Sequence, residues 1–244
     1  MLTLENVGWT APDGEEILRN ISLEIPEGKM TVITGPNGGG KTSLAKLIAG
    51  LVTPTEGKIL LDGEDITGWD MTERARHGIS YAFQQPVRFK GLTVRDLLEI
   101  SAEEALSQDM VCKYLGEVGL CAGEYIERVV DDSLSGGEGK RIEIATVLAR
   151  KNVKVRVFDE PEAGIDLWSF TNLIDVFQRL KNKPEEALLV ISHQERILNI
   201  ADRIVVVAEG HVRTAGDKDT VLPSLLGQEK VARCPMEEER SCAG

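Results

Sequence analysis

A glycine-rich segment that ends in a lysine and a threonine is the strongest chemical signal in the sequence. It reads Gly35-Pro36-Asn37-Gly38-Gly39-Gly40-Lys41-Thr42 and fits the pattern GxxxxGK(S/T). Glycines let backbone N–H groups turn inward around phosphate oxygens, and a helix that starts near Lys41 adds the positive end of its dipole. We therefore expect Lys41 to pair with the terminal phosphates of a nucleotide and the Thr42 hydroxyl to join a Mg²⁺ shell. The residues expected to bind the nucleotide here are Gly35, Asn37, Gly38, Gly39, Gly40, Lys41, Thr42 and Ser43.

A second segment joins an apolar strand to two carboxylates. It reads Val155-Arg156-Val157-Phe158-Asp159-Glu160. Successive side chains of an extended chain point to opposite sides, so Asp159 and Glu160 face different partners. We expect Asp159 to hold Mg²⁺ through water, and Glu160 to orient and deprotonate the water that attacks the terminal phosphate. A strand that ends in Asp-Glu is common by itself, but together with a phosphate-binding loop it predicts a hydrolytic site.

The third segment is a second glycine-rich helix start, Leu134-Ser135-Gly136-Gly137-Glu138. With it the sequence resembles the ABC ATPases, whose LSGG signature also lies just before the strand with the two carboxylates. Within one chain this helix start has no phosphate left to bind. The resemblance implies that Ser135, Gly136 and Gly137 address the γ-phosphate of ATP held by another copy, so that two chains enclose two ATP molecules.

Three further residues match the same family one by one. Gln84 resembles the Q-loop glutamine, which reaches Mg²⁺ and the attacking water. His193 resembles the switch histidine that contacts the γ-phosphate, and Asp166 resembles the D-loop aspartate that crosses the dimer interface. The resemblance implies ATP hydrolysis with ATP and Mg²⁺ as cofactors. The implied catalytic residues are Lys41, Gln84, Glu160 and His193, and the implied Mg²⁺ ligands are Thr42, Gln84 and Asp159.

One position departs from the family pattern. The family often stacks adenine on an aromatic residue near the end of the first strand, but Ala11 stands at that place. Trp9 lies nearby, although a tryptophan in the core or on the surface is the favoured interpretation of it. The basis of adenine selectivity therefore stays open at this stage.

Segments outside the phosphate loop are most similar to one branch of the family, the ATPase of the SUF iron–sulfur cluster assembly machinery (SufC type). They are 83–87 (FQQPV), 160–166 (EPEAGID) and 193–198 (HQERIL). Transporter ATPases more often carry Gln at the position of Glu138 and a small polar residue at that of Glu162. The resemblance implies that ATP-driven closure of a homodimer moves scaffold proteins of the SufB or SufD type, which carry the cluster chemistry.

Two other functions remain open. The chain could be the nucleotide-binding motor of a membrane ABC transporter and dock on separate membrane subunits. It could also be a non-enzymatic module that ATP binding alone closes, although Glu160 argues against this. A DNA-repair or chromosome-structuring ATPase would need long coiled-coil heptads between Thr42 and Leu134, and that gap contains none.

Alternating strands and helices must position these residues. The apolar run at 30–34 predicts a buried strand that leads into the phosphate loop, and Leu44, Leu47 and Ile48 recur behind it at helical spacing. Further strands are expected at 153–158, 188–192 and 204–208, with an amphipathic helix between the first two and a hairpin turn at Asp62-Gly63. We predict an α/β P-loop NTPase fold of the ABC ATPase type, with a mostly parallel sheet core, an antiparallel β portion and a small helical lobe.

The chain is expected to form one ATPase domain over residues 1–226, with the helical lobe at about 86–134. A helical pattern from Thr93 to Val118 indicates that lobe. Residues 227–244 are polar and acidic without periodicity, and we expect them to be a mobile tail. The tail contains Cys234 and Cys242, which we do not expect to fix a metal.

The charge and the apolar content of the sequence limit the kinds of partner that the chain can bind. The net charge of −12 argues against a surface held to nucleic acid or anionic lipid by charge alone. The sequence has no apolar run of about 18 residues and no secretory pattern at its start, so we expect a cytoplasmic protein without direct membrane insertion. Four cysteines without metal-ligand spacing fit free thiols in a reducing compartment.

Overall fold

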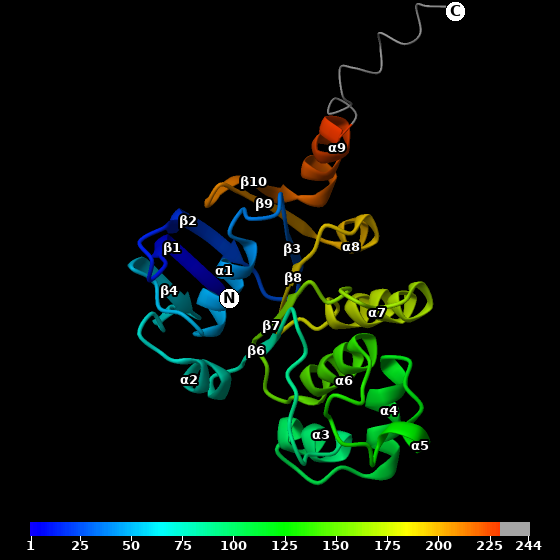
Figure 1. Cartoon of the computed structure of the whole chain (residues 1–244). Helices are drawn as coiled ribbons and strands as arrows, with labels where there is room; N and C mark the ends of the chain where they lie inside the picture. Colours follow the sequence, from blue (N-terminus) through cyan, green and yellow to red (C-terminus); the bar gives the residue numbers. More distant parts are fainter. Residues whose placement is uncertain (230–244) are drawn as a thin grey trace, which may run out of the picture.

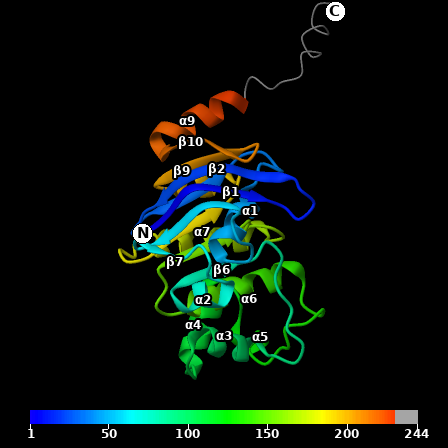
Figure 2. The same ribbon diagram turned by 90° about the vertical axis from the view of Figure 1, so that its left-hand side faces the viewer.

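The computed structural model describes residues 1–229, which are organised around two β-sheets (Figures 1 and 2). Residues 230–244, with Cys234, Cys242 and most of the predicted tail, lie outside the described residues. Helix α9 (Lys218–Glu229) runs past residue 227, where the sequence analysis placed the start of the tail.

The smaller sheet is antiparallel and has the strand order β2-β1-β4-β5. Its strands are β1 (Leu2–Thr10), β2 (Glu16–Ile25), β4 (Glu56–Leu61) and β5 (Glu64–Asp65). The predicted turn at Asp62-Gly63 joins β4 to β5, and its φ angles of 53° and 83° are those of a tight hairpin turn.

The larger sheet has the order β10-β9-β3-β8-β7-β6, and its strands from β9 to β6 are parallel. The strands are β3 (Met30–Thr34), β6 (Ile79–Ala82), β7 (Val155–Asp159), β8 (Ala187–Ile191), β9 (Arg203–Ala208) and β10 (His211–Asp217). In register, Phe158 lies between Ala82 and Val190. The loops that follow β3, β6, β7 and β8 therefore begin side by side at one edge of the sheet.

Side chains of the larger sheet alternate between two hydrophobic clusters. Val32 and Phe158 pack with the helices on one face, whereas Ile33 and Val157 pack with α1 and the smaller sheet. Every residue of β3, β7 and β8 is buried, as expected for strands that are covered on both faces. The other helices are α1 (Lys41–Ala49), α2 (Met71–Arg76), α3 (Val94–Ala102), α4 (Gln108–Glu117), α5 (Ala122–Tyr125), α6 (Gly136–Ala149), α7 (Leu167–Leu180) and α8 (Glu195–Ile200).

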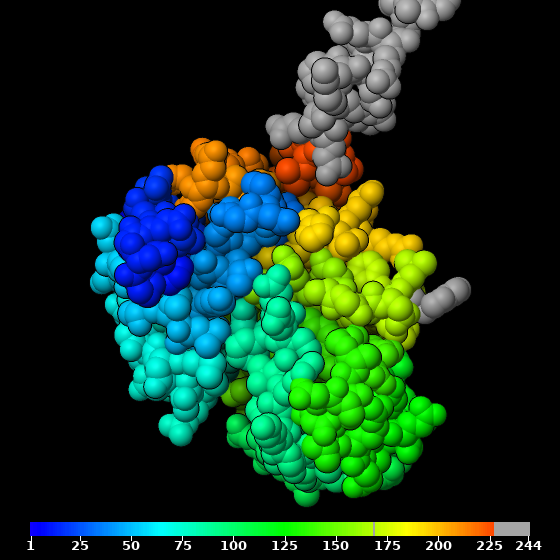
Figure 3. Space-filling model, viewed as in Figure 1, coloured from blue at the N-terminus to red at the C-terminus, as the bar shows by residue number. Residues whose placement is uncertain are grey.

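Helices α3, α4 and α5 form the helical lobe at one end of the molecule (Figures 1 and 3). Thr93, where the predicted helical pattern begins, caps α3, and Asp96 completes a capping box with it. The predicted helical stretch is nevertheless two helices, because Glu103 adopts a left-handed conformation that ends α3 and Ser107 caps α4. Apolar periodicity continues across this break, so the sequence pattern alone did not reveal it.

Helix α7 has the predicted amphipathic character with one exception. Phe170, Phe177 and Leu180 are buried, but Leu167 is 64% exposed at the first position of the helix. Within residues 1–229, none of the helices combines the length and the apolar character needed to span a bilayer.

Candidate nucleotide-binding site

The glycine-rich segment is the loop between β3 and α1. Gly35, Gly38 and Gly40 have φ angles of 133°, 76° and 100°, which residues with a side chain rarely adopt. A Cβ atom on Gly35 would lie 2.1 Å from the carbonyl oxygen of Val207 on β9. The loop therefore needs glycine to pass this close to the carboxyl end of the sheet.

Lys41 begins α1, and its side chain folds back onto the loop. It is 5% exposed, and its Nζ donates to the carbonyl oxygens of Gly35 at 2.8 Å and Pro36 at 2.9 Å. Burial lowers the pKa of Lys41, while the charges of Glu160 and Asp159 act to raise it. The ammonium group is thus held at the loop, where it can compensate the charge of a bound phosphate.

Thr42 and Asp159 meet beside the loop. Thr42 Oγ1 donates to Asp159 Oδ1 at 3.3 Å, and Tyr81 Oη donates to Asp159 Oδ2 at 3.0 Å. Asp159 is completely buried, and this burial raises its pKa. Adjacent hydroxyl and carboxylate oxygens are the hard donors that Mg²⁺ prefers, so these two residues fit the predicted metal. Bound Mg²⁺ would neutralise phosphate charge, while Tyr81 orients the carboxylate.

Glu160 follows β7 in a left-handed backbone conformation with a φ angle of 44°. Its N–H donates to the carbonyl oxygen of Ile191 at 3.0 Å, and its Oε2 accepts from Gln84 Nε2 at 2.7 Å. Residues other than glycine held at positive φ cluster at functional sites. The fold thus brings two predicted catalytic residues into contact; a role of Gln84 as a Mg²⁺ ligand stays a prediction.

Most of the predicted phosphate-handling residues line one cavity of 550 Å³. Its lining residues are Glu15, Ile17, Asn37, Gly38, Gly39, Gly40, Lys41, Thr42, Ser43, Gln84, Glu160 and His193. Gly35 and Asp159 do not line it, since Gly35 packs on β9 and Asp159 is buried behind Thr42.

The position at which the family often stacks adenine does not contribute to the cavity. Neither Ala11 nor Trp9 lines the cavity, and Trp9 packs against the core beneath the smaller sheet. Ile17 at the start of β2 and Glu15 before it line the cavity instead. The sequence analysis missed both, because an isoleucine that begins a strand carries no chemical signal. Tyr81 was missed for a similar reason, since its partner Asp159 lies 78 positions further along the chain.

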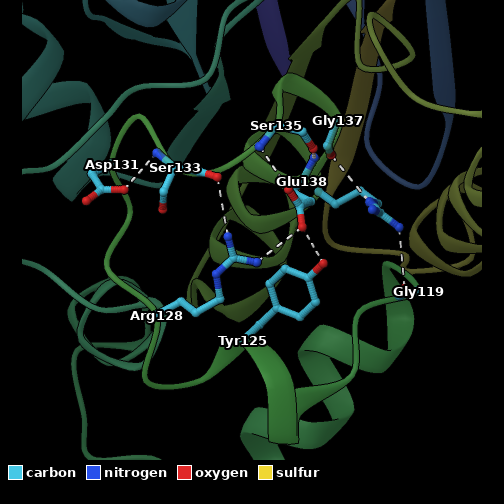
Figure 4. A network of polar contacts seen from close by, with 9 residues as sticks. Gly119, Tyr125, Arg128, Asp131, Ser133, Ser135, Gly137 and Glu138 are labelled. Carbon is cyan, nitrogen blue, oxygen red and sulfur yellow. Dashed lines mark hydrogen bonds and ion pairs between the residues drawn. The ribbon is translucent and has the colours of Figure 1, made fainter.

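The signature turn is fixed by a network centred on Glu138 (Figure 4). Ser135 caps α6, and the Glu138 carboxylate accepts from the Ser135 N–H at 2.8 Å in a capping box. Tyr125 Oη and, at 3.2 Å, Arg128 Nη1 both donate to the other oxygen of Glu138. Hydrogen bonds, that from Tyr125 foremost, lower the pKa of Glu138 to about 2. The carboxylate therefore ties the turn to the helical lobe in its ionised form.

The signature turn also lies against the segment that carries Asp166. A Cβ atom on Gly137 would be 2.6 Å from the carbonyl oxygen of Gly164. Arg141 Nη1 donates to Ser169 Oγ at 2.9 Å, and Ser169 Oγ donates to Asp166 Oδ2 at 2.7 Å. Ser135, Gly136, Gly137 and Asp166 do not line the phosphate cavity of their own chain.

Comparisons with known proteins agree with this geometry. A family model described as ABC transporter matches residues 18–163. An uncharacterised ABC transporter ATP-binding protein of Methanocaldococcus jannaschii is 38% identical over 214 residues, which are 84% of this chain and 85% of that protein. The lipopolysaccharide export system ATP-binding protein LptB of Escherichia coli is 31% identical over 229 residues, 91% of this chain and 92% of its own.

A solved structure gives the same result for the fold. It is a dimeric ATP-binding cassette in a post-hydrolysis state, bound to ADP and Pi. It matches 89% of this chain and 99% of its own length with a TM-score of 0.80 and 26% sequence identity.

Proposed function

Because this chain belongs to the ABC transporter family, as a cassette that binds ATP with Mg²⁺ and hydrolyses it, we propose that it is the motor subunit of a larger machine. The observation that supports this proposal is an apolar cavity of 210 Å³ at the junction of the sheet core and the helical lobe. Val87, Phe89 and Ile100 line it and are 41%, 40% and 61% exposed. Exposed apolar groups gathered at a cavity suit the apolar side chains of a partner helix.

The same segment of chain connects this cavity to the nucleotide site. Gln84 lines the phosphate cavity, and Val87 and Phe89, a few residues further on, line the apolar one. When Gln84 leaves Glu160 for bound nucleotide, the start of this segment must move, and with it the partner held by Val87 and Phe89. Closure of two copies around ATP would then move the bound partner.

The partner that we favour is a membrane subunit of a transporter. The names of the relatives support it, since LptB belongs to a lipopolysaccharide export system and the archaeal relative is named as a transporter ATP-binding protein. In that arrangement the chain works at the cytoplasmic face of the membrane, and none of the helices within residues 1–229 spans it.

A soluble scaffold of iron–sulfur cluster assembly, of the SufB or SufD type, is the second candidate. It is favoured by Glu138 and Glu162, two positions at which transporter ATPases more often carry other residues. Both carboxylates make specific contacts, Glu138 with Tyr125 and Arg128 and Glu162 with Ser192. No Phe, Tyr or Trp side chain that the structure describes lines the phosphate cavity, a further similarity to that branch.

Purification of the chain together with its native companions distinguishes the two candidates. Recovery with a multi-span protein in the membrane fraction would support the transporter subunit. Recovery of a soluble scaffold with iron and the absorbance of an iron–sulfur cluster would support the assembly ATPase instead.

A matched pair of variants tests the apolar cavity itself. Phe89→Ala should lose the partner and retain ATP binding. Met71→Ala removes an apolar side chain that is 42% exposed on α2, away from the cavity, and should retain the partner. Wild-type recovery of the partner with Phe89→Ala would contradict docking at this cavity.

A further inference from the structure

Glu162 is a largely buried carboxylate in the turn that follows Glu160, and ATP hydrolysis as described above gives it no task. Its Oε1 accepts from Ser192 Oγ at 2.5 Å. Its Oε2 is also buried and has no hydrogen-bond partner within the part of the chain that the structure describes. Burial raises the pKa of Glu162, whereas the Ser192 hydrogen bond and the electrostatic interaction with His193 act to lower it.

Ser192 belongs to the loop that carries His193. The serine is completely buried, and its N–H donates to the carbonyl oxygen of Ile33 at 3.1 Å. Its Oγ accepts from the N–H of Gln194 at 3.0 Å while it donates to Glu162. The Ser192 hydroxyl therefore contacts both the residue that follows His193 and the turn that carries Glu162.

The Glu160 turn and the His193 loop are joined at two points. One is the backbone hydrogen bond of 3.0 Å from Glu160 N–H to the carbonyl oxygen of Ile191, and the other is the Glu162–Ser192 contact. Glu160 and His193 both line the phosphate cavity. A shift of either segment would separate the two side chains that must act on the same phosphate.

We propose that Glu162 is a positioning residue for ATP hydrolysis, which holds the His193 loop against the Glu160 turn through the Ser192 hydroxyl. Packing alone is a poor explanation for it, because a buried carboxylate with one unpaired oxygen is less favourable than a neutral side chain of similar size. The arrangement is explained if the hydrogen bond fixes the loop. Glu162 itself lines no part of the phosphate cavity, so it acts through its neighbours.

Steady-state ATPase kinetics of three variants test this role. Ser192→Ala and Glu162→Ala should each lower kcat about ten-fold, with the KM for ATP within about two-fold of wild type. The double variant should be no slower than Ser192→Ala, because that change already removes the contact with Glu162. Glu162→Gln should retain more than about half of kcat, since its amide oxygen still accepts from Ser192.

The control and the contrary outcomes are equally defined. Glu185→Ala removes a carboxylate from the exposed turn before β8 and should leave kcat unchanged. Unchanged kcat in Ser192→Ala, or losses that multiply in the double variant, would overturn the proposal. If Glu162→Ala does not fold, the other two variants decide. A low kcat in Ser192→Ala together with an active Glu162→Gln supports positioning, and any other combination rejects it.

Discussion

Glu160 shows at the scale of one residue how this site prepares for hydrolysis. Its left-handed backbone and its N–H bond to Ile191 fix the direction in which the carboxylate leaves the chain. Gln84 Nε2 donates to one carboxylate oxygen of Glu160 at 2.7 Å. A general base must be held at the position of the water that it activates, and the backbone conformation and the Gln84 contact would both hold Glu160 for this predicted role.

Glu160→Gln should keep ATP binding and lose turnover by at least about 100-fold, because an amide cannot take the proton of the attacking water. The variant should also accumulate as an ATP-bound dimer. ATPase assays, nucleotide binding and size-exclusion chromatography with ATP measure these effects. Glu209→Gln is the control, since Glu209 also has a left-handed backbone but does not line the cavity; turnover near wild type in Glu160→Gln would remove Glu160 as the base.

Arg74 is a second residue whose environment predicts a measurable effect. It is completely buried, and within residues 1–229 its guanidinium donates to the carbonyl oxygens of Leu47, Ile48, Ile66, Thr67 and Trp69. Two of these carbonyls belong to the last turn of α1, where a positive charge also complements the helix dipole. The helix that carries Lys41 therefore depends on Arg74 at its far end.

Arg74→Met should lower the free energy of unfolding by about 2–4 kcal/mol, because it leaves buried carbonyl oxygens without donors. Urea denaturation measures this. Arg76→Met changes the exposed arginine of the same helix and should stay within about 0.5 kcal/mol of wild type. Equal stability of the two variants would show that the carbonyl contacts of Arg74 contribute little.

At the scale of elements, α6 connects the signature turn to the helical lobe through Glu138. The carboxylate accepts from the backbone of its own capping box and from Tyr125 and Arg128, which follow α4 in the chain. A glutamine at this position has one acceptor oxygen, so it could keep the bond from Ser135 or those from Tyr125 and Arg128, but not both sets. The acidic residue thus makes the attachment of the turn depend on pH.

The direction of that dependence follows from the pKa of Glu138, which is about 2 in the folded chain. A glutamate without these contacts has a pKa of 4.5. A depressed carboxylate pKa stabilises the fold above pH 4.5, and this contribution disappears as the pH falls towards 2. The difference in thermal unfolding midpoint between wild type and Glu138→Gln should therefore shrink as the pH is lowered through this window. Tyr125→Phe should reduce the difference, and a constant difference from pH 7 to pH 2.5 would contradict this account.

At the scale of the whole molecule, one chain contains two incomplete halves of a site. The phosphate cavity lies at the carboxyl edge of the larger sheet, and the signature turn lies beside Asp166 and lines no part of that cavity. The dimeric cassette that resembles this chain shows that the fold can pair. Two copies that face each other would complete two sites, each with a loop from one chain and a turn from the other.

Mixed dimers test this exchange. Lys41→Ala should weaken nucleotide binding and Ser135→Arg should block the signature turn, so each variant alone should be inactive. An equal mixture should recover up to about a quarter of wild-type turnover, because half of the random dimers are hybrids and each hybrid keeps one intact site. ATPase assays of the mixture and of each variant alone provide the measurement and its control. No recovery in the mixture would count against sites shared between chains.

The sequence by itself determined the parts of this protein that depend on neighbouring residues. The glycine-rich loop, the capping of α3 and α6, the Asp62-Gly63 turn and the apolar strands β3 and β7 each follow from local spacing and backbone preference. The predicted fold, the ATPase activity and the cofactors ATP and Mg²⁺ are confirmed. The assignment to iron–sulfur cluster assembly stays a prediction, as do the roles of the individual site residues.

Only the tertiary structure decided which distant residues meet. Gln84 reaches Glu160, Tyr81 reaches Asp159, and Glu162 reaches Ser192 because parallel strands end at one edge and place their following loops together. The same applies to Ile17 at the start of β2, which lines the phosphate cavity together with the loop after β3. Local sequence encodes the direction and the ends of each element, whereas contacts across tens of residues arise from sheet order and packing, which no short pattern contains.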